Sequence, residues 1–134
     1  MKKIFWVAFA SLTLFVASCS DETVDPATDP RDKFTGSWLC KETVTGTPTQ
    51  SFTITISKVG SGDSVKISNF SNYGTSAPQT YAEISGNSIV IPLQNITTTA
   101  IPVQGSGIYS SSGGEKISLN YSTDGQSASA VCTK

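Results

Sequence analysis

The stretch RDKFTGSWLC, residues 31–40, marks the point at which the chain changes from a polar tether to a domain. It contains Trp38, the only tryptophan outside the apolar N-terminal run. Just before it, Asp29 and Pro30 suit the N-cap and the first position of a helix. We therefore expect a short helical turn here, followed by a strand that begins at Gly36.

The chain beyond this stretch has the composition and alternation of an all-β domain. Serine, threonine and glycine are abundant, and few stretches suit a long helix. The pattern is clearest where Phe52, Ile54 and Ile56 alternate with serine and threonine. Elsewhere Pro92 indicates a bulge or a broken ladder bond. The predicted strands span residues 36–44, 51–59, 63–70, 80–85, 88–94, 103–110, 116–122 and 127–133.

The connections between these strands indicate how the strands are arranged. Short turns, such as the Gly-Asn pair at 86–87, alternate with longer loops at 45–50, 71–79 and 95–102. In an up-and-down meander, every second connection lies at the same end of the sheet. The alternation therefore favours an eight-stranded antiparallel barrel with a closed base and a mouth lined by loops. A β-sandwich is the alternative.

A helical turn followed by Gly36-Ser37-Trp38 at the start of the first strand resembles the lipocalin or calycin pattern. The resemblance implies that the turn, with Phe34, plugs the base of the barrel and that Trp38 packs over it. Lipocalins usually place a C-terminal arginine across this tryptophan. No arginine follows Arg31, and Lys134 is a poor substitute because it lacks a planar guanidinium. The chain thus resembles the small lipocalin-like lipoproteins of the Bacteroidetes group.

The N-terminus resembles a bacterial lipoprotein signal. Two lysines precede a short apolar run, which ends in Val16-Ala17-Ser18-Cys19. We expect a signal peptide at residues 1–18, a lipidated Cys19 that begins a flexible tether at 19–29, and a barrel domain at 30–134. Acyl chains on one residue would anchor the protein to a membrane. Ordinary secretion is the alternative.

The tether also bears on localisation. Asp21 and Glu22 resemble the acidic export signal of surface-exposed lipoproteins, so we expect a surface-exposed outer-membrane protein, with a periplasm-facing one as the alternative. Outside the cytoplasm, the two remaining cysteines, Cys40 and Cys132, are expected to form a disulfide. The first and last strands of a closed meander are neighbours, so such a bridge is feasible. Two free buried thiols are the alternative.

The search for catalytic chemistry finds little. The sequence has no histidine, which excludes a Ser-His-Asp triad and leaves little support for zinc. The carboxylates of the domain are scattered near turns, and Glu42 alone shares the parity of Trp38 and Cys40 and could point inward. The net charge is -1, and the sequence contains no basic patch that would indicate nucleic-acid binding. We expect a monomeric, non-catalytic protein without a cofactor or metal.

Two function classes follow from this reading. The first is a binding module whose barrel holds a small apolar or amphipathic ligand. The second is a protein-interaction module, resembling a protease inhibitor, with a filled barrel that works through its rim. For the first class, the expected cavity-lining residues are Phe52, Ile54, Ile56, Val65, Ile67, Ile89, Ile91, Leu93, Ile117 and Leu119.

Overall fold

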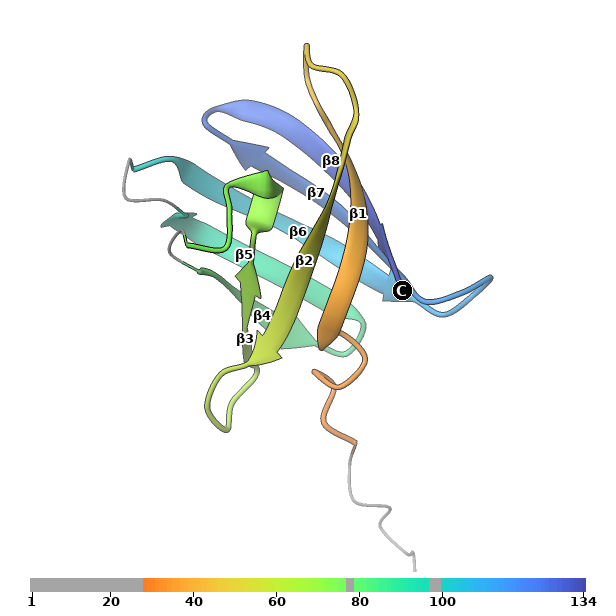
Figure 1. Cartoon of the computed structure of the whole chain (residues 1–134). Helices are drawn as coiled ribbons and strands as arrows, with labels where there is room; N and C mark the ends of the chain where they lie inside the picture. Colours follow the sequence, from red (N-terminus) through yellow and green to blue (C-terminus); the bar gives the residue numbers. More distant parts are fainter. Residues whose placement is uncertain (1–27, 77–78, 97–99) are drawn as a thin grey trace, which may run out of the picture.

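Eight antiparallel strands form one sheet that closes on itself, because β1 pairs with β8 as well as with β2 (Figure 1). The computed structural model describes residues 28–76, 79–96 and 100–134. The predicted up-and-down barrel is therefore confirmed, and the β-sandwich is excluded. The strands are β1 (Gly36–Val44), β2 (Gln50–Lys58), β3 (Ser64–Ser68), β4 (Thr80–Ser85), β5 (Ser88–Asn95), β6 (Pro102–Ser110), β7 (Lys116–Thr123) and β8 (Gln126–Thr133).

The two ends of the barrel differ in their connections. The base carries the β2–β3, β4–β5 and β6–β7 connections, together with the segment that leads into β1 (Figure 1). The mouth carries the other four, including a 3-10 helix, η1 (Phe70–Asn72), after β3. The predicted alternation of short and long connections fails at the last two. The β6–β7 connection spans residues 111–115, whereas β7 and β8 are joined by Asp124 and Gly125 alone.

The interior of the barrel is packed with apolar side chains from alternate positions of every strand. In β2, Phe52, Ile54 and Ile56 are buried and the residues between them are more exposed. Gly105 and Gly107 of β6 face Tyr121 and Leu119 of β7, and both pairs are in direct register. A Cβ atom on Gly107 would lie 2.6 Å from the backbone oxygen of Ser118. These two glycines therefore allow the backbone and side chains of β7 to lie unusually close to β6.

The base is closed around Trp38, as the Gly-x-Trp motif predicted. Trp38 is fully buried, and its Nε1 donates a hydrogen bond to the backbone oxygen of Phe34 at 2.7 Å. Gly36 has a φ of 112°, a conformation that favours glycine. Lys134 lies with its Nζ 4.5 Å from the centre of the Trp38 ring. Lys134 thus lies where the resemblance places an arginine, and its ammonium makes a cation–π contact with the ring instead of a planar stack.

The segment before β1 forms consecutive hydrogen-bonded turns at residues 30–34 instead of a regular helix. Its Asp29 accepts a hydrogen bond from the backbone nitrogen of Arg31, as expected of an N-cap. Sequence analysis missed the role of Arg31 itself. Its guanidinium pairs with Asp29 and donates to the backbone oxygens of Val59, Gly60 and Ser64. It therefore ties this segment to the β2–β3 turn.

A disulfide joins the first strand to the last. Cys40 and Cys132 are direct partners in the register of β1 and β8, and their sulfur atoms are bonded. Both residues are buried on the inner face of the barrel. The predicted pairing is thus confirmed, and the alternative of two free thiols is excluded.

Candidate functional site

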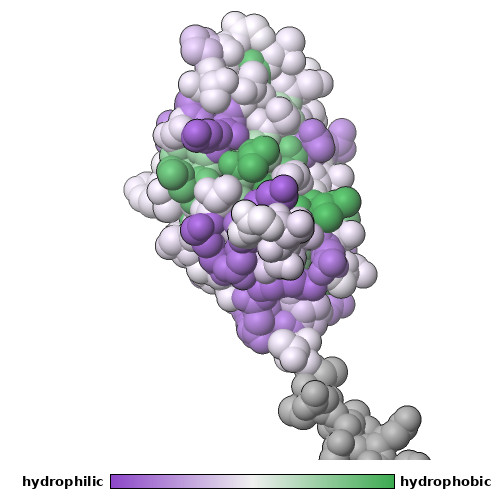
Figure 2. Space-filling model, turned by 90° about the vertical axis from the view of Figure 1, so that its right-hand side faces the viewer, coloured by the Kyte–Doolittle hydropathy of each residue, from purple (hydrophilic) through white to green (hydrophobic). Residues whose placement is uncertain are grey.

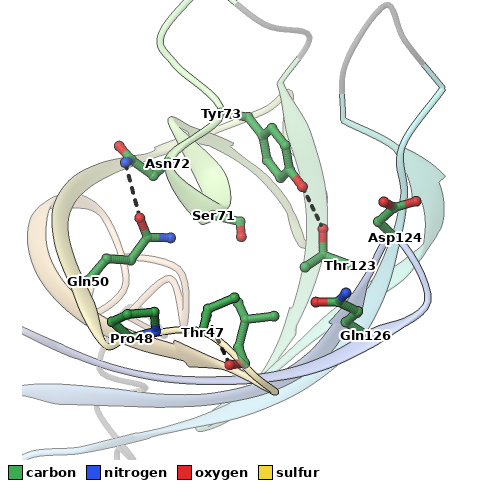
Figure 3. A pocket seen from close by; sticks show the side chains of 10 residues that line it. Thr47, Pro48, Gln50, Ser71, Asn72, Tyr73, Thr123, Asp124 and Gln126 are labelled. Carbon is green, nitrogen blue, oxygen red and sulfur yellow. Dashed lines mark hydrogen bonds between the residues drawn. The ribbon is translucent and has the colours of Figure 1, made fainter.

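The mouth of the barrel contains a pocket of about 480 Å³ (Figure 3). Three parts of the chain form its walls: the β1–β2 loop, η1 with the residue that follows it, and the short β7–β8 turn. The lining combines hydroxyl, amide and carboxylate groups with a few apolar side chains. It consists of Val44, Thr47, Pro48, Gln50, Ser71, Asn72, Tyr73, Thr123, Asp124 and Gln126.

A buried carboxylate lies directly beneath one wall of this pocket. Glu42 has no exposed surface, because it points inward from β1 with the same parity as Trp38 and Cys40. Its Oε2 accepts a hydrogen bond from Nε2 of Gln50 at 2.5 Å, and its Oε1 accepts one from Oγ of Ser71 at 2.7 Å. The expectation that Glu42 could point inward is confirmed. Both of its donors are pocket residues.

The donor Ser71 is placed by an irregular segment after β3. Asn69, Ser71 and Asn72 all have positive φ values, between 50° and 61°. Asparagine tolerates this conformation well, whereas for serine it is uncommon. The side chain of Asn69 fixes the segment, since its Nδ2 donates to the backbone oxygen of Thr53 and its Oδ1 accepts from the nitrogen of Gly74. The strained backbone thereby turns the Ser71 hydroxyl into the barrel.

A chain of hydrogen bonds connects Glu42 with the surface. Nδ2 of Asn72, which is exposed, donates to Oε1 of Gln50 at 3.3 Å (Figure 3). Gln50 in turn donates to Glu42. Ser71 lies between this pair and the opposite wall, with its hydroxyl inside the pocket (Figure 3). These contacts thus place the amide of Gln50 and the hydroxyl of Ser71 between Glu42 and the pocket.

The opposite wall is built from Tyr73, which follows η1, and from the β7–β8 turn. The hydroxyl groups of Tyr73 and Thr123 lie 3.3 Å apart and form a hydrogen bond (Figure 3). Asp124 and Gly125 have φ values of 50° and 75°, as in the two-residue turns that Asp-Gly sequences favour. This turn places Asp124 at the rim of the pocket (Figure 3).

The residues predicted to line a cavity have a different role in the structure. Nine of the ten are buried and belong to one packed apolar cluster, and none of the ten lines the mouth pocket. The nine are Phe52, Ile54, Ile56, Val65, Ile67, Ile89, Ile91, Ile117 and Leu119. Alternation identified the inner face of each strand, but it could not distinguish a side chain that surrounds a ligand from one that packs against another side chain.

The tenth residue, Leu93, was predicted wrongly. It is 70% exposed, and it lies on the outside of β5. The register of β5 with β6 shifts between Ile91 and Gln94, which inserts one extra residue into β5. A bulge of this kind interrupts the alternation of inward and outward side chains. The preceding Pro92 had indicated such a bulge, yet its effect on Leu93 was not taken into account.

Other predicted positions fall into two groups. The base motif, Gly36 and Trp38, lies at the end of the barrel opposite the pocket. Cys19, the expected signal peptide and most of the tether lie outside the described residues.

In the part of the chain that the structure describes, no three His, Cys, Asp or Glu side chains are grouped so that they could hold a metal ion. Within the same residues, no helix has the length and hydropathy needed to cross a membrane.

Comparison with known proteins supports the architecture alone. No family model and no curated protein matches the chain. Among solved structures, the chain is similar to a redesigned β-barrel, with a TM-score of 0.59 and 13% sequence identity. The similarity covers 79% of this chain and 95% of the designed one. At this level of identity, the similarity indicates a shared barrel fold and no shared function.

Proposed function

We propose that this protein is a membrane-anchored, surface-exposed, lipocalin-like lipoprotein of the Bacteroidetes type that binds a small amphipathic ligand without catalysis. The observation that carries the binding proposal is the pocket at the mouth, whose volume of about 480 Å³ falls within the usual range for small-molecule sites. The ligand site differs from the one first expected, because the barrel interior is packed and the pocket lies above it.

The lining of the pocket supports an amphipathic ligand. Val44, Pro48 and Tyr73 supply apolar surface, while Gln126 and Thr123 supply hydrogen-bonding groups. Ligand sites commonly combine apolar walls with a small number of polar groups that fix orientation. A purely apolar ligand would leave these polar groups without partners, which costs binding free energy.

The position of the chain's entry into the barrel is consistent with a tether. Lys33 contacts Asn87 of the β4–β5 turn, and Arg31 contacts the β2–β3 turn, so the segment before β1 lies against the base. If Cys19 carries lipid, the anchor is attached at the base. The mouth then points away from the membrane, toward ligands in the surrounding medium.

The anchoring proposal is tested by fractionation of cells that express the Cys19→Ala variant. We expect the wild-type protein in the membrane fraction and the variant in the soluble fraction, because the variant cannot be acylated. A Cys40→Ala variant is the matched control, since it also removes one cysteine but leaves the anchor intact. Retention of Cys19→Ala in membranes would exclude the lipoprotein proposal.

The binding proposal is tested by native mass spectrometry of protein purified from its own cell envelope. We expect a bound small molecule on the wild type and its loss from Gln126→Trp, which fills the pocket from the rim. Ser129→Trp is the control, because Ser129 is an exposed residue of the same strand and does not line the pocket. Repeated absence of a bound molecule from the wild type, or equal binding by both variants, would count against the proposal.

A second candidate function is favoured by the outer surface. Exposed apolar side chains gather across one face of the barrel (Figure 2). Leu39, Ile108 and Val131 are each about half exposed or more, and the registers of β1, β6, β7 and β8 bring them near one another. A filled barrel with such a face could act as a protein-interaction module. Co-purification of a partner protein that is lost in the Val131→Lys variant, together with the absence of a small molecule from the mouth pocket, would favour this alternative.

A further inference from the structure

Glu42 is a buried carboxylate that no cation neutralises within residues 28–76, 79–96 and 100–134. The four ion pairs of this part of the chain all lie at the base of the barrel, and Glu42 belongs to none of them. Two hydrogen-bond donors contact it, whereas a carboxylate has about four acceptor sites. A buried charge without an opposite charge is unfavourable unless it is compensated. A cation bound next to Glu42 would therefore stabilise the buried carboxylate.

Polar groups are concentrated in the same half of the barrel. Among the residues that the structure describes, the buried polar ones apart from Arg31 at the base are Glu42, Ser71, Thr80 and Thr123, and all four lie toward the mouth. Oγ1 of Thr80 has no hydrogen-bond partner among the described residues. A core that only had to be filled would favour apolar side chains at these positions. Ser71 and Thr123 line the pocket itself, so its inner surface can receive a polar group of a ligand.

We infer that the ligand of the mouth pocket carries an ammonium group, and that this group pairs with the carboxylate of Glu42. The inference rests on the proposed function, since it names the chemical class of the ligand for the same pocket. Asp124 at the rim adds a second negative charge to the pocket, and no lysine or arginine is among the described residues that line it. The electrostatic potential of the pocket therefore favours a cation over an anion.

The Gln50 amide is the group that the ammonium would replace. One N–H of this amide donates a hydrogen bond to Oε2 of Glu42. An ammonium would make a stronger hydrogen bond to the same oxygen. The other end of the amide is held by Asn72 through a bond of 3.3 Å at the exposed edge of the pocket. Rotation of Gln50 toward solvent breaks these two bonds and opens Oε2 to the pocket. Ser71 continues to hold Oε1 and keeps the carboxylate in place.

The rest of the pocket suits a short apolar tail on such a ligand. Val44, Pro48 and Tyr73 can contact the tail while the ammonium points down toward Glu42. The ligand class is thus a small amphipathic amine. A similar pocket without Glu42 would accept a neutral alcohol of the same size equally well.

The test compares three probes of the same chain length, n-hexylammonium, 1-hexanol and hexanoate, by isothermal titration calorimetry and NMR on the wild type. We expect the ammonium to bind at least about tenfold more tightly than the alcohol, as for one charge-assisted hydrogen bond, and hexanoate to bind most weakly. Glu42→Gln, which keeps the size of the side chain, should remove this preference, so that hexylammonium and hexanol bind to the variant with affinities within about twofold of each other. Glu83→Gln, an exposed carboxylate outside the pocket, is the control.

Several results would overturn the inference. Equal binding of hexylammonium and hexanol by the wild type would exclude ammonium recognition while supporting the mouth pocket as a ligand site. A preference that survives in Glu42→Gln would exclude Glu42 as its source. Binding of none of the three probes would also overturn the inference, and the co-purification experiment would then decide the proposed function separately.

A second measurement covers the case in which Glu42→Gln does not fold. In the wild type, hexylammonium should shift the NMR resonances of the Gln50 side-chain amide, because the ammonium takes its place on Glu42. Hexanol in the same pocket should shift these resonances less, because it leaves the bond between Gln50 and Glu42 in place. A purely structural role of Glu42 would give no such difference, and identical spectra with both probes would overturn the inference.

Discussion

Removal of the disulfide is the most informative perturbation of this fold, because its effect can be calculated from the connectivity. Cys40 and Cys132 are 92 residues apart in the sequence. In the chain-entropy model, closing a loop of this length lowers the entropy of the unfolded chain by about 15.6 cal/mol/K, which corresponds to about 4.6 kcal/mol at 25 °C. We therefore expect Cys40→Ala to lower the free energy of unfolding by about this amount.

The expected change in melting temperature follows from the size of the domain. A domain of about 105 residues has an unfolding entropy of about 0.22 kcal/mol/K, so the variant should melt about 20 °C below the wild type. Six residue pairs connect β1 with β8, and their ladder remains in the variant. The far-UV circular dichroism of the folded protein should therefore change little.

The assay is thermal and urea unfolding under non-reducing conditions, in a Cys19→Ala background that removes the third thiol. Cys132→Ala and the double variant are the controls. All three should lose the same stability, because each breaks the same bond, and reduction of the parent protein should give the same loss. Unequal losses, or two thiols that react with a dye in the native parent protein, would refute the pairing and the calculation.

Two further predictions concern the barrel wall and the base. Gly107→Ala places a Cβ against the β7 backbone, so urea unfolding should show that the free energy of unfolding falls by about 1–3 kcal/mol. Gly62→Ala, at an open position, should change the free energy of unfolding by less than about 0.5 kcal/mol. Similar values for both variants would contradict the close approach of β7 to Gly107. Hydrogen bonds from Arg31 hold the pKa of Asp29 well below its usual 3.8. Asp29 therefore stabilises the fold above that pH, and its contribution falls as the pH drops toward the lowered pKa. Asp29→Asn should be less stable than the wild type at pH 7, with the difference shrinking below pH 3.8; a constant difference down to low pH would exclude this origin.

The barrel itself could be predicted from the chain because buried and exposed residues alternate along most of its strands. In β2, three apolar residues at every second position determine which face is buried, and in β1 the parity of Trp38 and Cys40 did the same for Glu42. The hairpin turn at residues 86–87 fixed the register of its neighbours. Each of these signals is local, and together they predict the closed meander.

The candidate site could not be predicted in the same way, because its parts come together only in three dimensions. Glu42 lies beside Ser71 because Asn69, Ser71 and Asn72 adopt positive φ values, which the sequence patterns did not indicate. Gln50 stood at the edge of a loop in the sequence but begins β2 in the structure. Leu93 shows the reverse problem, since one inserted residue moved a predicted core side chain to the outside.

The bond between Cys40 and Cys132 also has a mechanical consequence. A pulling force applied between the segment before Cys40 and the residues after Cys132 runs through the first residues of β1, crosses the sulfur bridge and leaves by the end of β8. Residues 41–131 lie outside this covalent path of the force. The walls of the pocket all belong to this part of the chain. Drag on the ends of the domain would therefore leave the shape of the mouth unchanged.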